Sequence, residues 1–312
     1  MAIAEPSSTT KPTDEAVAVS IPCDDGVVLG GHLWPPEGID HHGCVIVNPA
    51  TGVLARYYHH YARFLSKHGF TVLTYDYRGI GRSRPESLRG CRYRWHDWGE
   101  LDFDAAVRFL HARDPAAPQM VVGHSFGGAL PGLSENGARV SRMLTVGAQY
   151  GYWRDYDCRQ RLALFAKWHV AMPALTALFG YFPGKRLGWL EDLPAGIAQD
   201  WAFGRGPIGH LREPAARQRI RRRFEDVTAP IVAVTTTDDP FATVAALGRT
   251  LGDYPNAPSR VVQLDPADLG FAAIGHFGLF HARHANGFWR DTLSWLRDGT
   301  DPWPEASHVR NP

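Results

Sequence analysis

The sequence of 312 residues predicts an α/β fold built on a doubly wound, mainly parallel sheet. Short apolar runs alternate with amphipathic stretches along most of the chain, as strands alternate with helices in such folds. Two of the runs, residues 44–47 and 230–234, contain almost no polar side chain, which is typical of strands buried on both faces of a parallel sheet. The chain is long enough for one large domain of this kind with an insertion.

The individual elements are predicted from periodicity and from the turn residues between them. Residues 16–22 and 27–34 flank an Asp-Gly turn and predict a β-hairpin. The amphipathic stretch 57–68 predicts a helix that ends at Gly69. The further predicted strands are residues 44–47, 70–75, 120–122, 142–148, 230–235 and 260–264, and the further predicted helices are residues 98–113, 244–251 and 279–296.

Composition and charge disfavour several classes of partner. The formal net charge is +1, which gives no reason to expect a nucleic acid as partner. The four cysteines have neither CxxC nor zinc spacing, so we expect free thiols in a reducing compartment and no metal site. Residues 1–15 lack the pattern of a signal peptide and predict a flexible tail. No apolar run approaches the roughly 18–20 residues of a membrane span, so we expect no membrane span and a cytoplasmic protein.

The segment 123–127 reads Gly-His-Ser-Phe-Gly, between a predicted strand and a stretch of small residues. In a Gly-x-Ser-x-Gly turn of this kind the serine lies on a strained strand-to-helix turn, and the glycines allow close approach of backbone that a Cβ would block. Its hydroxyl then projects from the sheet edge. The alternative is a glycine-rich turn with an ordinary serine, but the flanking strand and helix favour Ser125 as a nucleophile.

This segment resembles the nucleophile elbow of the α/β-hydrolase family. Residues 76–83, Asp-Tyr-Arg-Gly-Ile-Gly-Arg-Ser, resemble the family's loop after the fourth strand. Their Gly-x-Gly lacks the rest of a dinucleotide fingerprint, so we expect no nucleotide cofactor. The resemblance covers residues 16–300 and is closest to bacterial hydrolases of the serine-aminopeptidase-like and monoacylglycerol-lipase-like group. Residues 48–52 and 274–278, Asn-Pro-Ala-Thr-Gly and Ile-Gly-His-Phe-Gly, carry that narrower similarity.

The resemblance implies a catalytic triad in the chain order Ser, acid, His. A serine hydroxyl needs a base, and the base needs an orienting acid. Asp238 and Asp239 both follow the strand predicted at residues 230–235, and the position directly before Pro240 favours Asp239. Asp238 is then expected to serve in a turn or as a helix cap. His276, between the last predicted strand and the closing helix, is where the family has its base.

An oxyanion hole requires two backbone N–H groups that face the developing charge. One is expected from Phe126, directly after the nucleophile. The other is expected from the loop 48–53, where the family often has His-Gly and this sequence does not. Pro49 has no N–H to donate. By register we expect Thr51 to donate, with Ala50 as the next choice.

The alternation of strands and helices stops over residues 150–222, which are rich in aromatic side chains. This segment predicts either a helical subdomain with its own core or, as the resemblance implies, a cap over the sheet edge. We favour the cap, because so many aromatic residues suit the wall of an apolar pocket. Trp153 and Trp189 are the first choices for residues that face the substrate. The basic residues 217–223 predict a solvated helix face.

The predicted organisation is therefore a core of residues 16–149 and 223–300, a cap of residues 150–222, and tails at residues 1–15 and 301–312. The resemblance implies a serine hydrolase without metal or other cofactor, which cleaves a small to medium apolar ester or thioester through an acyl-enzyme. Two alternatives stay open: acyl transfer by the same triad, and a ligand-binding protein with little catalysis. The expected partner is a small apolar acyl substrate, and a homo-oligomer is possible.

Overall fold

A nine-stranded sheet forms the centre of the computed structural model, which describes residues 16–38, 40–206, 213–304 and 307–309. Its strands are β1 Val17–Pro22, β2 Val28–Trp34, β3 Gly43–Asn48, β4 Phe70–Tyr75, β5 Gln119–His124, β6 Val140–Val146, β9 Ile231–Thr236, β10 Ser259–Leu264 and β11 Ser307–Val309. They lie in the order β1-β2-β4-β3-β5-β6-β9-β10-β11. The six strands from β4 to β10 are parallel, whereas β1, β2 and β11 add to the two edges as antiparallel strands.

Helices cover both faces of this sheet, as the alternating side-chain directions of its strands require. Helices α1 His59–Lys67 and α11 Phe288–Asp298 pack on one face, against residues such as Val45 and Val122. Helices α3 Asp104–His111, α8 Pro214–Asp226 and α9 Val244–Leu251 pack on the other face. The predicted doubly wound, mainly parallel α/β fold is confirmed.

Shorter helical segments connect these elements. They are η1 Ala55–Tyr58, η2 Gly81–Ser83, α2 Trp95–Asp97, η3 Trp98–Phe103, η4 Ser125–Ala129, α4 Leu130–Leu133, η5 Gly137–Arg139, α10 Gly275–Gly278 and η8 Ala282–His284. The helix predicted at residues 98–113 is thus a π-helical turn, η3, that continues into α3.

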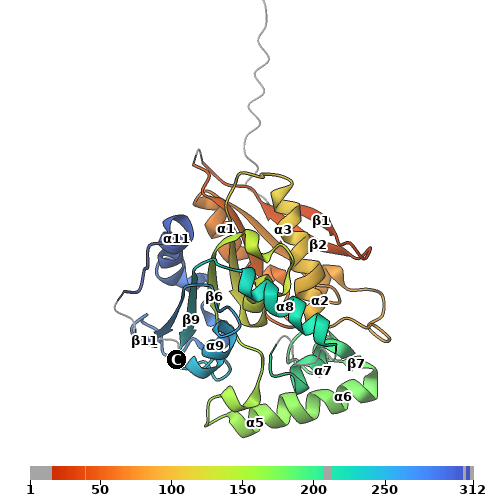
Figure 1. The fold of residues 1–312 in the computed structure, drawn as a ribbon. Helices are drawn as coiled ribbons and strands as arrows, with labels where there is room; N and C mark the ends of the chain where they lie inside the picture. The colour runs from red at the N-terminus through yellow and green to blue at the C-terminus, as the bar shows by residue number, and fades with distance from the viewer. Residues whose placement is uncertain (1–15, 39, 207–212, 305–306, 310–312) are drawn as a thin grey trace, which may run out of the picture.

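The segment between β6 and α8 lies beyond the carboxyl ends of the parallel strands, where α5, α6 and α7 gather below the sheet in Figure 1. Its elements are η6 Trp153–Asp155, α5 Arg161–Phe165, η7 Ala166–Ala171, α6 Met172–Phe179, β7 Tyr181–Phe182, β8 Leu193–Pro194 and α7 Ala195–Phe203. We call residues 150–206 of this segment the cap. The cap contributes side chains to the same cavity as Ser125.

The cap ends earlier than the predicted boundary at residue 222. Helix α8 belongs to the helix layer of the core, because Phe224 packs against Gly132 and stacks edge-on with Tyr254 at 4.8 Å. The basic residues do lie largely on the exposed face of α8, while Arg223 reaches Glu100 at 2.7 Å. The sequence did not reveal this boundary, since a basic amphipathic helix suits either layer.

Two predictions near the C-terminus are wrong. The closing helix does not run over residues 279–296; α11 begins at Phe288, because the chain first turns through η8 and Gly287. The indole of Trp289 donates to the carbonyl of Leu279 (2.8 Å) and fixes that turn. Residues 301–312 are not simply a tail, because β11 pairs with β10. The tail predicted at residues 1–15 lies outside the described residues.

Elements α5, η7 and α6 form one continuous helix, Arg161–Phe179, of 19 residues. By length and composition it is apolar enough to cross a membrane, and 22% of its apolar window is buried. The expectation that no apolar run approaches this length is therefore wrong. Core helices of globular proteins can be as long and as apolar, so these two properties alone do not assign the helix to a membrane.

Candidate active site

Ser125 follows the last residue of β5 in a backbone conformation that side chains rarely adopt. Among the non-glycine residues of the described ranges it alone has a positive φ, of 54°. Such strain persists only where the surroundings enforce it. A Cβ at Gly127 would lie 2.4 Å from the carbonyl oxygen of Asn48, and one at Gly123 would lie 2.6 Å from Gly128. The glycines are therefore required for the close approach of β3, β5 and η4.

His276 and Asp239 form a buried pair next to this serine. The Nδ1–H of His276 donates to Oδ2 of Asp239 at 2.7 Å. The other carboxylate oxygen of Asp239 accepts the backbone N–H groups of Phe241 (2.9 Å) and Ala242 (3.0 Å). Burial alone would raise the pKa of Asp239, but His276 and these N–H groups outweigh it and lower the pKa. The carboxylate is thus ionised and held in place to orient the imidazole.

Asp238 has a different task. Its carboxylate accepts the backbone N–H groups of Ile274 (2.8 Å) and Gly275 (3.0 Å), at the start of α10. It also accepts the hydroxyl of Thr236 at 2.7 Å. Asp238 lies in the turn after β9 and holds the segment that carries His276, but it is not the cap residue of α10, whose N-cap is Ile274. His276 lies in α10 rather than in a loop.

A chain of hydrogen bonds connects the oxyanion loop, the elbow and the histidine segment. The N–H of Ala50 donates to the hydroxyl of Tyr58 (2.9 Å), and that hydroxyl lies 2.7 Å from Nδ1 of His124. Nε2 of His124 lies 2.9 Å from the carbonyl of His276. The carbonyl requires a proton on Nε2, and in the neutral imidazole Nδ1 accepts the hydroxyl of Tyr58. Complete burial, and then the nearby His276, lower the pKa of His124 to about 3, so it stays neutral.

This arrangement narrows the choice of the second oxyanion donor. The N–H of Ala50 is engaged by Tyr58. For the N–H of Thr51, the described part of the chain shows no hydrogen-bond partner. The hydroxyl of Thr51 accepts the indole N–H of Trp95 at 3.2 Å, which fixes the loop from the side of α2. Of the two N–H groups expected from this loop, that of Thr51 is therefore without a partner in the described residues and that of Ala50 is not.

The loop of residues 76–83 is hydrogen-bonded to the segments that surround the site. Asp76 accepts the N–H groups of Ala55 (2.7 Å) and Arg82 (2.9 Å), so it ties the loop to the helical turn after the oxyanion segment. The guanidinium of Arg78 binds Asp102 at 2.6 Å in the core. Gly79 and Gly81 of this loop have positive φ angles, of 84° and 48°, so they are required for its backbone conformation. In the described ranges, no group of three or more His, Cys, Asp or Glu residues is placed to hold a metal ion.

Gln149, which follows β6, is a site residue that the sequence analysis missed. Its side-chain N–H donates to Oγ of Ser125 at 3.1 Å. Its side-chain carbonyl accepts the N–H of Gly151, which fixes the amide orientation. Gln149 thus holds the nucleophile hydroxyl in the resting site. No motif marks it, since its position depends on how the chain leaves the sheet after β6.

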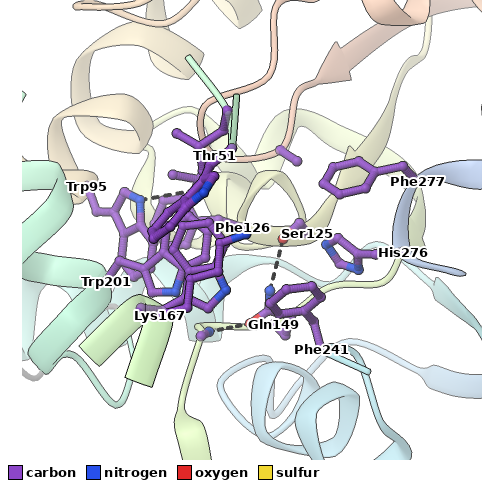
Figure 2. A pocket seen from close by; sticks show the side chains of 15 residues that line it. Thr51, Trp95, Ser125, Phe126, Gln149, Lys167, Trp201, Phe241, His276 and Phe277 are labelled. Atoms are coloured by element: carbon purple, nitrogen blue, oxygen red, sulfur yellow. Dashed lines mark hydrogen bonds between the residues drawn. The ribbon is translucent and has the colours of Figure 1, made fainter. Parts of the chain in front are cut away.

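A cavity of about 150 Å³ lies over Ser125 and His276, and side chains of the cap form part of its wall. Figure 2 shows Trp95, Trp201 and Lys167 on one side of Ser125, and His276 and Phe277 on the other. The lining is mostly aromatic and apolar: Ala50, Thr51, Trp95, Ser125, Phe126, Gln149, Gly151, Lys167, Trp168, Trp189, Leu190, Trp201, Phe241, His276 and Phe277.

Of the two tryptophans chosen from the sequence, the structure places Trp189 in the cavity lining and Trp153 outside it. Trp153 packs against Phe165 with ring centroids 5.2 Å apart, so this choice is corrected. The sequence gave no signal to separate them, because both lie in irregular parts of an aromatic-rich segment. The rings that do form the wall stack on one another: Trp95 on Phe126 at 4.2 Å and Trp168 on Trp201 at 4.6 Å.

Comparisons with known proteins agree with this fold. A family model described as "Serine aminopeptidase, S33" matches residues 39–189. A monoacylglycerol lipase of Mycolicibacterium smegmatis is 33% identical over 107 residues, which are 34% of this chain and 36% of that protein. The match thus spans about a third of that relative's length.

Solved structures match over almost the whole chain. A soluble variant of monoglyceride lipase from Saccharomyces cerevisiae has a TM-score of 0.64 at 15% identity, covering 95% of this chain and 98% of its own. An esterase from Pyrococcus furiosus has a TM-score of 0.55 at 18% identity, covering 93% and 95%. At these identities the matches show that the chain has the α/β-hydrolase fold.

Proposed function

We propose that the protein is a serine hydrolase that cleaves esters of small to medium apolar acyl groups. One observation carries the proposal: the strained Ser125 and His276 line one aromatic cavity, and the buried Asp239 holds the imidazole from behind. A base that is oriented by an acid and lies with a nucleophile in one cleft is typical of an active site. The similar proteins named as monoacylglycerol lipase and esterase support an ester as the substrate.

In the proposed mechanism, Oγ of Ser125 attacks the acyl carbon while Nε2 of His276 takes its proton. Asp239 keeps the imidazole in the required tautomer and stabilises the imidazolium. The N–H groups of Phe126 and Thr51 bind the oxyanion. His276 then gives its proton to the leaving group, and water cleaves the acyl-enzyme by the same steps in reverse.

The size and lining of the cavity support the substrate class. A space of about 150 Å³ walled largely by tryptophan and phenylalanine rings favours a short acyl chain with apolar methylenes over a long lipid chain. The side-chain N–H of Gln149 lies within hydrogen-bond distance of Oγ of Ser125. As Oγ loses its proton and bonds to the acyl carbon, this N–H would be free to donate to the reacting atoms instead.

A fluorophosphonate probe and p-nitrophenyl esters test this function. Ser125→Ala is expected to lose probe labelling and to lower kcat by roughly 10⁶-fold, the scale seen for such serines. Ser141→Ala, at an exposed position of β6 where the hydroxyl donates to the carbonyl of Gln119 far from the cavity lining, is the control and should keep both activities. Circular dichroism shows whether each variant is folded. A folded wild type that neither reacts with the probe nor turns over esters would instead be a ligand-binding protein.

A further inference from the structure

Lys167 brings a positive charge into the wall of an otherwise apolar cavity. It lies in η7 of the cap and lines the same cavity as Ser125. Its ammonium lies 4.6 Å from the ring centroid of Trp168 and 4.4 Å from that of Trp189. The two indole faces attract the cation, but they accept none of its three N–H groups as a carboxylate would.

Four of the five carboxylates of the cap lie against other cations, and the fifth, Asp157, accepts the backbone N–H of Arg159. Asp155 binds Arg249, Asp192 binds Arg84, Asp200 binds Arg94 and Glu191 lies near Lys185. Within the described residues, no carboxylate lies within ion-pair distance of Lys167. Burial lowers the pKa of Lys167, because an ammonium away from water loses hydration. A half-buried cation without a counter-charge is suited to an anion supplied from outside.

We propose that Lys167 binds a carboxylate at the far end of the acyl group, so that the preferred substrates are esters whose acyl chain ends in a carboxylate. This inference rests on the proposed function, since it assigns the acyl side of that active site. The apolar rings would contact the methylenes between the ester and the carboxylate, and Lys167 would bind the end.

The position of Lys167 relative to His276 assigns the carboxylate to the acyl part. The leaving oxygen must come within hydrogen-bond reach of His276, which protonates it. The leaving group therefore extends on the His276 side of Ser125. Lys167 lies on the opposite side, with Trp95 and Trp201 (Figure 2), where the acyl chain has to go.

The number of positive groups favours a carboxylate over a phosphate. Lys167 is the one Lys or Arg side chain among the lining residues of this cavity in the described part of the chain. Phosphate sites in proteins usually combine several donors, often the fork of an arginine. A single ammonium in a small cavity matches one unit of negative charge.

Two pairs of esters test the proposal by hydrolysis. The first pair is p-nitrophenyl hemiglutarate and p-nitrophenyl pentanoate, which differ in a carboxylate at the acyl end. The second pair, 4-carboxyphenyl and 4-carbamoylphenyl pentanoate, differs in a carboxylate on the leaving group. For each pair, the measured quantity is kcat/KM of the charged ester divided by kcat/KM of the uncharged one. Lys167→Met should lower this ratio for the first pair by about ten- to hundredfold, the range for a lost charged hydrogen bond. Lys167→Arg should keep part of it.

Lys185→Met is the matched control, because Lys185 is an exposed lysine of the cap outside the cavity. It should leave both ratios unchanged. A first-pair ratio that does not respond to Lys167→Met overturns the proposal. A response of the second pair alone also overturns it, because the anion would then belong to the leaving group.

A binding measurement separates this inference from the proposed hydrolysis. Calorimetry with monomethyl glutarate compares Ser125→Ala with the double variant Ser125→Ala/Lys167→Met, neither of which needs turnover. The double variant should bind about tenfold or more weakly. Equal Kd values overturn the Lys167 subsite, whether or not the wild type hydrolyses esters. A retained difference in Kd with no turnover by the wild type overturns only the hydrolase assignment.

Discussion

Asp238 and Asp239 are adjacent carboxylates that the fold directs to different partners. Asp239 faces His276, whereas Asp238 holds the backbone of Ile274 and Gly275. Asp239→Asn should lower kcat by about 10⁴, because an amide there favours the wrong imidazole tautomer. Asp238→Asn keeps an acceptor oxygen and should cost far less. Steady-state kinetics on p-nitrophenyl esters decide between them, and the reverse ranking would assign the triad acid to Asp238.

His124 is expected to make stability depend on pH. Its folded pKa, about 3, lies below its ordinary value of 6.5, so the unfolded chain takes up a proton that the folded protein does not. The His124 contribution is therefore complete above pH 6.5 and is lost as pH falls from 6.5 towards 3. Between pH 7 and pH 5 the free energy of unfolding should drop by about 2 kcal/mol from this group alone.

Urea unfolding at several pH values measures this effect. His124→Gln should be less stable at pH 7, because the hydrogen bonds to Tyr58 and His276 change, yet its stability should fall less steeply with acid. His60→Gln, at an exposed position on α1, is the control and should keep the wild-type slope. An unchanged slope in His124→Gln would contradict the assignment of a buried neutral imidazole.

The cap helices set the size of the acyl pocket in the proposed function. Trp189 lines the cavity and Trp153 does not, although both are half-buried tryptophans of the same cap. Each methylene that fits an apolar pocket adds about 0.8 kcal/mol, or roughly fourfold in binding. Trp189→Ala should therefore move the optimum of kcat/KM to longer acyl chains, and Trp153→Ala should leave it in place. The same profile in both variants, from acetyl to octanoyl, would show that the cap does not define this pocket.

Elements with their own local signal were predictable from the sequence, and those that depend on tertiary contacts were not. The strands near the site were found because apolar runs end in turn residues, and β4 and α9 have the predicted bounds. The elbow was found because its glycines are required by the close approach of backbone. The later start of α11 was missed, since the turn before it depends on the indole of Trp289.

The candidate site shows the same division. Ser125, Asp239 and His276 lie at positions that chain order and strand ends indicate; the structure places Ser125 and His276 in one cavity and Asp239 against the imidazole. Gln149 and Trp95 could not be predicted, because neither belongs to a motif. Gln149 reaches Ser125 because the chain leaves the sheet next to it after β6. Trp95 reaches Thr51 because α2, directly before η3, lies beside the oxyanion loop.

At the scale of the whole molecule, one of the ion pairs between the cap and the core lies next to the site, and its carboxylate is buried. Asp200 of α7 is buried and binds the guanidinium of Arg94, and it also accepts the backbone N–H of Trp95 at 2.9 Å. Trp95 in turn donates to the hydroxyl of Thr51 in the oxyanion loop. This contact between the cap and the core therefore also positions a wall of the cavity and the loop that is expected to bind the oxyanion.

Asp200→Ala should for this reason affect stability and catalysis together. Removing one partner of a buried ion pair costs about 3–5 kcal/mol when the other stays buried, and Arg94 is a third exposed, so the lower value of about 3 kcal/mol is expected. Urea unfolding measures this loss, and ester kinetics under conditions where the variant is folded should show a lower kcat. The control is Asp192→Ala, which breaks the more exposed pair between cap and core with Arg84 and should cost about 1 kcal/mol or less. If Asp200→Ala loses stability but keeps the wild-type kcat, then the ion pair fastens the cap without positioning the oxyanion loop, and Thr51 is held by other contacts.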